Sequence, residues 1–361
     1  MRKIRINMLS QATIKEAQGV GSVYIEQLAL LREKDDDIFE IYENSNSKNF
    51  DIYHIHTVNP QYFNRINNHH INIAFVHFIP ETLEGTLNIP RLSEKAFYRY
   101  VNRFYKRVDE LVVVNPMYKK QLMELGIKED SITFIPNFVS KKSFYRLDKS
   151  KISEIRKEFD IPEDKFVVAA CGQCHQQKGV VDFIKTAEKC PDIYFIWLGG
   201  FVFGKTTGGY KEVKEAIDNA PSNCKFLGII KRERINDLYN AADVFFSPSF
   251  QEFFPMSILE ACSSGKPLIL RDLDCYKYIF PDHYLTGNNV DHFAIQINAL
   301  KENSDLFKKY EELSFKISND YSEESVNEIW REYYQRIYNK YLNDSSKKLV
   351  PLDEELKNIN K

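Results

Sequence analysis

Short apolar runs separated by segments of helical spacing make up most of the chain. The runs are rich in β-branched and aromatic residues and end in polar or turn residues, as buried parallel strands do. They cover residues 4–9, 38–42, 52–56, 73–77, 111–115 and 130–138, then 166–170, 194–198, 225–227, 243–246 and 267–270. Helical patterns link most of them, so the sequence predicts an open, parallel α/β architecture.

The strands form two series, separated by a polar stretch near residues 145–152. At 361 residues the chain is long for one core, which favours two domains. We expect two Rossmann-like domains, over 1–147 and 148–321, whose parallel sheets face each other across a cleft. Clefts of this kind bind nucleotides and sugars.

Two carboxylates, Glu252 and Glu260, lie eight residues apart around a predicted strand, loop and helix. The strand at 243–246 ends in Ser-Pro, and Pro255 is expected to be the first residue of the next helix. Glu252 then lies in the loop at the carboxyl edge of a sheet, where ligands bind, and Glu260 lies on the helix.

Two glycine-containing turns lead into predicted helices. In the second half, Gly172 and Gln173 precede Lys178, which stands where the helix at 180–189 begins. A cation adds nothing to a helix N-terminus by itself, so its presence indicates an anionic ligand such as a diphosphate. In the first half, the turn at 18–22 suits an anion or a sugar hydroxyl, although a simple tight turn explains it equally well.

Three histidines, His54, His56 and His77, lie at predicted strand ends. A histidine in such a position is often only structural, but three at one sheet edge make a functional role about as probable. We favour His77 for that role because it directly precedes the loop at 78–82.

The predicted helix at 92–108 carries basic residues at every fourth position, starting from Arg91. The basic and aromatic residues of interest are Lys95, Arg99, Arg103, Lys106, Arg107, Tyr98, Phe104 and Tyr105. Like charges at this spacing destabilise an isolated helix, so an anionic lipid surface is the expected partner. The alternative is a solvated helix that packs on the sheet by its aromatic face. Nucleic acid is a weaker option, because no other nucleic-acid module is present.

Bulk composition narrows the choice of function. The net charge of −2 gives no general argument for nucleic acid, and no apolar window is long enough to span a bilayer or act as a secretion signal. The six cysteines have no framework spacing, which favours reduced thiols. Redox or zinc chemistry at Cys171 and Cys174 is disfavoured, because no second pair is present for a metal.

The stretch from Glu252 through Glu260 to Gly265-Lys-Pro267 resembles the signature of the retaining glycosyltransferases of family four, which have the GT-B fold. Six other features of this family precede that stretch, in the order that the family has. They are Gly19-Val20-Gly21, His77, Pro136-Asn137, Gly172 with Lys178-Gly179, Gly199-Gly200 and Ala241-Ala-Asp243. The resemblance covers residues 1 to about 342. It implies that the first domain binds the acceptor and the second a nucleotide sugar. It also implies that a helix at about 322–342 packs back on the first domain, ahead of a charged tail at 346–361.

The resemblance implies a role for each matched residue. Glu252 would bind hydroxyls of the donor sugar, and Glu260 the ribose hydroxyls of a nucleotide. The backbone N–H groups of Phe253 and Phe254 would face the sugar or phosphate, and Gly172, Gln173 and Asn137 would complete the donor site. Lys178 would stabilise the departing diphosphate without any metal or other cofactor. His77 would face the reacting centre, and Gly19-Val20-Gly21 the acceptor.

Two departures from the family pattern indicate a subgroup. Gln173 stands where the family usually has an arginine, which leaves Lys205 and Arg271 as weak candidates for a second diphosphate cation. The glycine-rich turn expected after the Gly265-Lys-Pro267 strand is replaced by Arg271-Asp-Leu-Asp-Cys-Tyr-Lys277. The stretches at 18–24, 77–82, 172–173 and 270–274 resemble those of bacterial enzymes that add a second hexose to monoglycosyl-diacylglycerol. A UDP-glucose or UDP-galactose donor, a glycolipid acceptor and a peripheral position on the cytoplasmic side of the cell membrane are implied.

Other functions stay open at this point. The acceptor could be a saccharide or a polyprenyl-linked sugar of surface polysaccharide synthesis. A non-catalytic sugar-binding module is a remote alternative, because both carboxylates and Lys178 are present. A dinucleotide-dependent dehydrogenase is disfavoured, because no Gly-x-Gly-x-x-Gly with an acidic partner follows an early strand.

Overall fold

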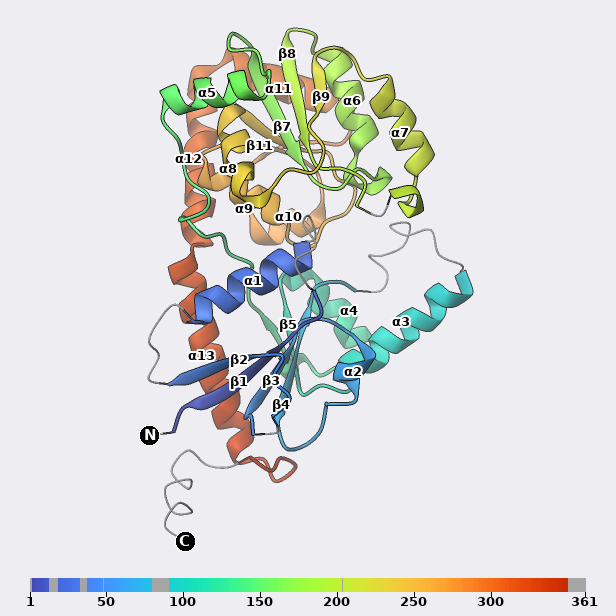
Figure 1. The fold of residues 1–361 in the computed structure, drawn as a ribbon, viewed down its shortest axis with the longest axis vertical. Helices are drawn as coiled ribbons and strands as arrows, with labels where there is room; N and C mark the ends of the chain where they lie inside the picture. Colours follow the sequence, from blue (N-terminus) through green and yellow to red (C-terminus); the bar gives the residue numbers. More distant parts are fainter. Residues whose placement is uncertain are drawn as a thin grey trace. The chain divides into compact units, whose positions relative to one another are not determined.

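The computed structural model describes residues 2–12, 19–32, 38–47, 49–79, 91–202 and 204–349. These residues form two compact units. The first comprises 2–79, 91–137 and 323–349 within the described ranges, and the second comprises 138–322. Each unit is built around its own parallel sheet (Figure 1).

The described part of the first unit contains a six-stranded sheet of order β2-β1-β3-β4-β5-β6. Its strands are β1 (Ile4–Leu9), β2 (Phe39–Glu43), β3 (Ile52–Ile55), β4 (Ile71–Val76), β5 (Glu110–Val113) and β6 (Ile132–Phe134). Because β2 lies on one side of β1 and β3 on the other, the strand order reverses between β1 and β3. The loops that leave the carboxyl ends of these two strands diverge there, which is where parallel sheets bind ligands.

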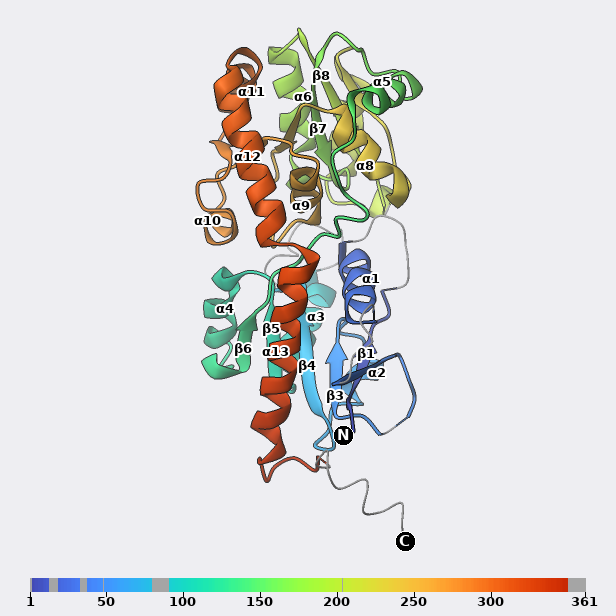
Figure 2. The same cartoon turned by 90° about the vertical axis from the view of Figure 1, so that its left-hand side faces the viewer.

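The helices of the first unit are α1 (Gly19–Arg32), α2 (Pro60–Phe63), α3 (Arg91–Tyr105), α4 (Lys119–Glu124) and α13 (Glu323–Leu342), with 3₁₀ turns η2 (Pro116–Tyr118) and η3 (Glu129–Ser131). The long helix α13 runs along one face of the sheet (Figure 2). Its Trp330 and Tyr334 are buried against His54 of β3. Near its end, Lys340 and Tyr341 bind the fully buried carboxylate of Glu110. The C-terminal helix is therefore part of the core of this unit.

The described part of the second unit also contains a six-stranded parallel sheet, of order β12-β11-β10-β7-β8-β9. Its strands are β7 (Phe166–Cys171), β8 (Ile193–Leu198), β9 (Cys224–Phe226), β10 (Val244–Ser247), β11 (Leu268–Arg271) and β12 (Leu285–Gly287). The order reverses between β7 and β10, whose Val168 and Val244 are register partners. The loops after these two strands carry Lys178 and Glu252.

Helices cover both faces of this second sheet (Figure 1). They are α5 (Lys149–Glu158), α6 (Val180–Lys189), α7 (Tyr210–Asp218), α8 (Arg232–Ala241), α9 (Met256–Ser263), α10 (Asp274–Ile279), α11 (Val290–Glu302) and α12 (Ser304–Asp320), with 3₁₀ turns η4 (Gln176–Lys178) and η5 (Gly204–Thr206). Phe183 of α6 packs at the centre against Phe195 and Trp197 of β8 and Phe246 of β10. This aromatic core fixes α6, and hence the turn before it, on the sheet.

Several predicted boundaries are wrong by a few residues. The run at 130–138 contains only the short β6, because Glu129–Ser131 forms a 3₁₀ turn. α3 ends at Tyr105 rather than at residue 108. Pro255 is the N-cap of α9 and not its first residue. Among the helices within the described ranges, none is long and apolar enough to cross a membrane.

Candidate active site

The turn after β7 brings backbone very close to backbone. Gly199 has φ +136°, and a Cβ there would lie 2.0 Å from the carbonyl oxygen of Gly172. Gly179 has φ +73°, and its Cβ would lie 2.3 Å from the carbonyl oxygen of Pro248. Any side chain at these two positions would force the loops apart. Gly179 therefore lets the loop after β10 lie directly on the turn that carries Lys178, and Gly199 lets the end of β8 lie against Gly172.

Hydrogen bonds fasten this contact. The N–H of Phe250 donates to the carbonyl of Gln177 over 2.8 Å, and the hydroxyl of Ser249 donates to the same carbonyl over 3.2 Å. Both donors belong to the loop that leads to Glu252. The two loops thus form one structure at the point where the strand order reverses.

Lys178 and Glu252 meet across this junction. Nζ of Lys178 lies 2.5 Å from Oε1 of Glu252, and the two side chains are 27% and 9% exposed. A carboxylate that is so poorly solvated needs a charged partner, which Lys178 provides. The structure thus brings together the residue predicted to bind diphosphate and the residue predicted to bind a sugar.

Glu260 lies on α9 with only 3% of its side chain exposed. One of its oxygens accepts a hydrogen bond from Arg232 of α8, and Oε2 accepts a 2.9 Å bond from the hydroxyl of Tyr239. Burial raises the pKa of Tyr239 well above its ordinary value, so the phenol stays protonated and donates. Arg232 also lies over the ring of Phe144, 4.8 Å from its centroid.

Arg232 and Tyr239 were not found from the sequence. They precede Glu260 by 28 and 21 residues, and they reach it only because α8 packs beside α9. A helix pattern shows which face is buried but not which charges meet across two helices. Their contact with Glu260 makes both residues part of the candidate site.

Arg271 is committed to the protein itself. Its guanidinium donates to the carbonyls of Pro248 and Asn288 and to Asp182, and it stacks 3.8 Å from the ring centroid of Phe250. Each of its three nitrogens has a partner within the fold. The suggestion that Arg271 replaces the missing diphosphate cation is therefore wrong, because it instead clamps the loop between β10 and Glu252. The other candidate, Lys205, is exposed on η5.

The remaining predicted donor residues fall in different places. Gly172 and Gln173 are half-buried at the end of β7, and Phe253 is half-buried beside Glu252. The ring of Phe254 is buried against Phe280 and Tyr321, so only its backbone could meet a ligand. Asn137 belongs to the first unit.

The three predicted histidines of the first unit lie together. Nε2 of His77 is 3.3 Å from Nδ1 of His56, and the rings of His54 and His56 are 4.4 Å apart. Burial lowers the pKa of His54 and of His77 to about 3 and that of His56 well below its ordinary value. All three imidazoles are therefore neutral at neutral pH.

The glycine turn of the first unit is not a turn in the structure. Gly19, Val20 and Gly21 lie in the first turn of α1, so the helix begins earlier than predicted. The residues just before them, 13–18, lie outside the described residues, as do 80–82 of the loop after His77.

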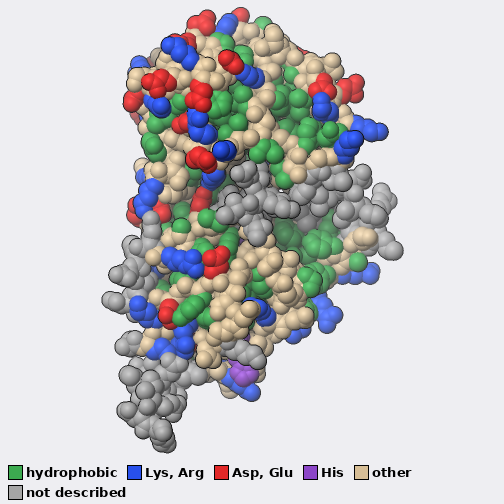
Figure 3. Space-filling model, in the orientation of Figure 1, with side chains coloured by type: hydrophobic (Ala, Val, Ile, Leu, Met, Phe, Trp, Pro, Cys, Tyr) green, Lys and Arg blue, Asp and Glu red, His purple; other side chains and the backbone are tan. Residues whose placement is uncertain are grey.

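The basic residues of α3 are exposed, as a charged surface requires. Lys95, Arg99 and Arg103 and the following Lys106 and Arg107 lie at the surface. Figure 3 shows lysine and arginine side chains over the region that α3 occupies in Figure 1. Tyr98 is half-buried, and its neighbour Phe97 is 36% exposed.

Two aromatic residues predicted to face a membrane do not. Phe104 and Tyr105 are 0% and 1% exposed, and the hydroxyl of Tyr105 donates to the carbonyl of Phe78. With Val101, also buried, they form the stripe by which α3 packs on its unit. That part of the membrane prediction is wrong, because these side chains belong to the core.

The two cysteines at and after the end of β7 are free thiols, of which Cys174 is buried and Cys171 is half-buried. Burial raises the pKa of Cys171 and of Cys174 to about 12, so both remain thiols at neutral pH. A thiol is a poor nucleophile and a poor metal ligand. Neither redox nor zinc chemistry is supported here.

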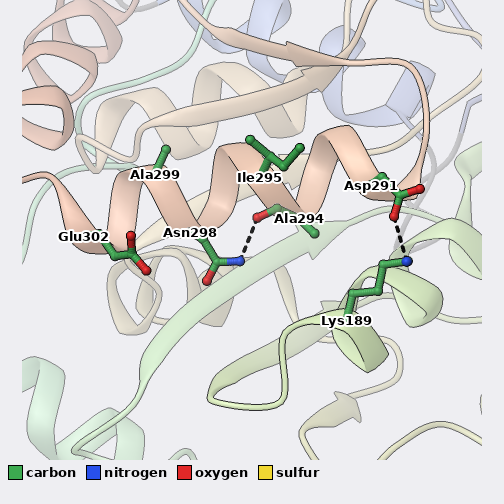
Figure 4. A pocket seen from close by; sticks show the side chains of 7 residues that line it. All are labelled: Lys189, Asp291, Ala294, Ile295, Asn298, Ala299 and Glu302. Carbon is green, nitrogen blue, oxygen red and sulfur yellow. Dashed lines mark hydrogen bonds and ion pairs between the residues drawn. The ribbon is translucent and has the colours of Figure 1, made fainter.

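A groove of about 610 Å³ lies between α6 and α11 of the second unit (Figure 4). The ion pair of Lys189 with Asp291 stands at one end, and Ile295 and Asn298 line it. Asn298 donates to the carbonyl of Ala294 within its own helix. The groove holds none of the residues of the candidate site.

Each of the two units matches a family of known proteins. Residues 18–142 match the family described as glycosyltransferase family 4, and residues 151–318 match glycosyl transferases group 1. The chain is 39% identical over 338 residues to an alpha-galactosylglucosyldiacylglycerol synthase of Streptococcus pneumoniae, covering 93% of this chain and 90% of that protein. It is 24% identical to a processive diacylglycerol alpha-glucosyltransferase of Acholeplasma laidlawii, covering 93% and 98%.

Solved structures agree on the fold. The HepE protein of Anabaena, in complex with UDP and glucose, superposes with a TM-score of 0.73 at 17% identity, covering 93% of this chain and all of that one. A sucrose-phosphate synthase of Thermosynechococcus elongatus gives 0.78 at 13% identity, covering 94% and 100%. The prediction of the GT-B fold, with two Rossmann-like domains, is confirmed.

Proposed function

The chain belongs to the glycosyltransferases of family 4, and on this premise we propose that it transfers glucose or galactose, with retention, from a UDP-sugar to monoglucosyl-diacylglycerol. The product is a diglycosyl-diacylglycerol. The observation that carries this proposal is the 39% identity, over nearly the whole chain, to the pneumococcal synthase named for such a product. Because that name contains galactose as the outer sugar, UDP-galactose is the first donor to test.

In this proposal the second unit binds the UDP-sugar. Lys178 stabilises the negative charge that develops on the diphosphate as it leaves, and Glu252 accepts hydrogen bonds from hydroxyls of the sugar. Their 2.5 Å ion pair supports this assignment, because it holds both groups at the strand ends where the sheet order reverses. The backbone N–H groups of Phe253 and Phe254 add donors beside Glu252.

Glu260 binds the ribose hydroxyls. Both of its oxygens are held in place, by Arg232 and by Tyr239, so the carboxylate is presented in one orientation. Gly172, Gln173 and Asn137 complete the donor site in the proposal. No second diphosphate cation is assigned, and Lys178 carries that role.

The first unit supplies the acceptor side. His77 faces the reacting centre, and the first turn of α1, with Gly19, Val20 and Gly21, offers backbone N–H groups to a hydroxyl of the acceptor. Its pKa of about 3 makes His77 a weak base, so it is better suited to hydrogen bonding to a sugar than to proton abstraction.

A glycolipid acceptor requires contact with a bilayer, and α3 supplies the surface for it. Lys95, Arg99, Arg103, Lys106 and Arg107 form what we call the α3 basic surface, and all are exposed. Basic residues next to an anionic leaflet contribute about 1 kcal/mol each. We place the enzyme on the cytoplasmic face of the cell membrane, held there peripherally, with Phe97 and Tyr98 at the lipid boundary.

The direct test uses liposomes of anionic lipid with and without monoglucosyl-diacylglycerol. The purified protein and radiolabelled UDP-galactose or UDP-glucose are added, and the lipid extract is separated and its new linkage determined. We expect a labelled diglycosyl lipid only when the acceptor is present. Absence of label from the lipid fraction with both donors contradicts the proposal.

A polyprenyl-linked acceptor is the competing substrate. The chain is 25% identical, over 73% of its length, to an Escherichia coli galactosyltransferase whose acceptor is GlcNAc-diphosphoundecaprenol. Offering both acceptors in the same vesicles separates the two hypotheses, because label will appear in one lipid class and not in the other.

A further inference from the structure

His56 is the second member of the histidine cluster, and it touches His77 directly. Its Nδ1 lies 3.3 Å from Nε2 of His77, a hydrogen-bonding distance for two ring nitrogens. The rings of both residues stack on Phe75, with centroids 5.1 Å and 4.4 Å away. Within the described residues, no group of three or more His, Cys, Asp or Glu side chains is placed to hold a metal ion.

His56 is held rigidly. It is 3% exposed, and besides Phe75 its ring meets His54 and the edge of Tyr24, 5.0 Å away. Behind it, Nδ1 of His54 is 2.7 Å from the hydroxyl of Tyr334 on α13. These contacts fix the plane of the ring, and within that plane the bond to Nε2 of His77 selects the orientation that points Nδ1 toward it.

The surroundings of Nε2 of His56 indicate which histidine donates the hydrogen bond between His56 and His77. Among the described residues, its Nε2 is buried without a hydrogen-bonding partner. If His77 donated the bond, neutral His56 would carry its own proton on Nε2 and bury an unsatisfied N–H. If His56 donates from Nδ1, Nε2 keeps only a lone pair. Orphaned buried N–H groups are rarer than orphaned acceptors, so the second arrangement is favoured.

From this geometry we propose that His56 is a positioning residue, which donates from Nδ1 to Nε2 of His77 and so makes His77 present an Nδ1–H donor to the sugar oxygens. The proposal rests on the proposed function only in placing His77 at the substrate. It gives His77 a defined part in the reaction, as a neutral hydrogen-bond donor, and excludes the role of general base for Nδ1.

The first test does not depend on activity. The full-length protein is labelled with ¹⁵N-histidine, and long-range ¹⁵N–¹H correlations at pH 7.5 assign the tautomer of each ring, with His56→Asn and His77→Asn identifying the signals. We expect Nδ1–H on both His56 and His77. A proton on Nε2 of His77 overturns the inference, and this result stands even if the protein proves to use another acceptor.

The second test uses amide replacements. The amide nitrogen of Asn takes roughly the place of Nδ1, and that of Gln the place of Nε2. His56→Asn keeps the donor, so we expect kcat within about threefold of the unsubstituted protein, whereas His56→Leu loses a hydrogen bond and should lower kcat about tenfold. His77→Asn should have a higher kcat than His77→Gln, because Asn keeps a donor at the place of Nδ1 and Gln does not.

Controls separate positioning from folding. UDP affinity should be unchanged in all four variants, because the nucleotide is assigned to the second unit. His70→Asn is the matched control, since His70 is also buried in the first unit with Nδ1 on a backbone carbonyl, and its kcat should not change. Equal kcat for His56→Leu and the unsubstituted protein overturns the inference. Should His56→Leu fail to fold, the inference is tested by the kcat values of His77→Asn and His77→Gln and by the tautomers seen in the ¹⁵N–¹H spectrum.

Discussion

Nζ of Lys178 and Oε1 of Glu252 lie 2.5 Å apart, so one ion pair joins the loop after β7 to the loop after β10. The two residues are proposed to have separate duties, one toward the diphosphate and one toward the sugar. Replacing Lys178 and replacing Glu252 should therefore have different effects on UDP binding and on hexose transfer.

Lys178→Met should weaken UDP binding and lower turnover by roughly a hundred- to a thousandfold, as loss of a key electrostatic stabiliser does. Glu252→Ala should abolish hexose transfer but keep or raise UDP affinity, because Lys178 is released for the diphosphate. Calorimetry with UDP and the liposome assay measure the two effects.

Lys189→Met is the matched control for this pair, because Lys189 forms an ion pair with Asp291 on the same unit but outside the site. Lys189→Met should change neither the affinity for UDP nor the rate of hexose transfer. If Glu252→Ala retains transfer from a hexose donor, the assignment of Glu252 is wrong.

Arg232 and Glu260 give a second prediction. Arg232→Ala leaves one oxygen of a buried carboxylate without its cation, so we expect lower UDP affinity and a loss of stability of about 1 kcal/mol, since Arg232 is itself 43% exposed. Arg234→Ala is the control on the same helix, because Arg234 pairs with Glu158 and Asp237 instead. Equal UDP affinity for Arg232→Ala and Arg234→Ala would contradict a role for Arg232.

The strand and helix pattern was largely readable from the sequence because local spacing determines it. Ile4–Leu9 and Val180–Lys189 have the predicted limits, since an apolar run or an amphipathic period begins and ends there. β12 was missed, because Leu285–Gly287 is too short to show a pattern. Val101, Phe104 and Tyr105 have the spacing of a core stripe, so the burial of Phe104 and Tyr105 follows from the same helical period that aligns the basic residues on another face.

The site was only partly readable. Lys178, Glu252 and Glu260 stand out by residue type and position, and the structure pairs two of them. The partners of Glu260 and the three bonds of Arg271 depend on how distant elements pack. No local sequence pattern encodes such contacts, because they depend on residues far apart in the chain.

The buried histidines predict how stability depends on pH. The folded pKa of His54 is about 3, below the value of about 6.5 expected in the unfolded chain, so the unfolded state binds more protons as pH falls below 6.5. Stability should therefore decrease on acidification, by about 1.4 kcal/mol at pH 5.5 from His54 alone. His56 and His77 act in the same direction.

Thermal unfolding at pH 7.5 and at pH 5.5 checks this effect. The decrease should persist in 0.5 M salt, because burial and not surface repulsion causes it. A melting temperature that is equal or higher at pH 5.5 would show that the histidines are solvated in the folded protein.

The α3 basic surface gives the last prediction. Arg99→Glu with Arg103→Glu should weaken binding to anionic vesicles, because each basic residue near the leaflet contributes about 1 kcal/mol, and loss of two corresponds to roughly thirtyfold. Lys120→Glu with Lys128→Glu changes net charge equally at exposed positions of the same unit and is the matched control. Vesicle sedimentation at low and high salt measures the binding of both double variants. Screening at high salt should reduce the difference in vesicle affinity between them. If both double variants bind as the unsubstituted protein does, α3 is a solvated helix and the membrane contact lies elsewhere.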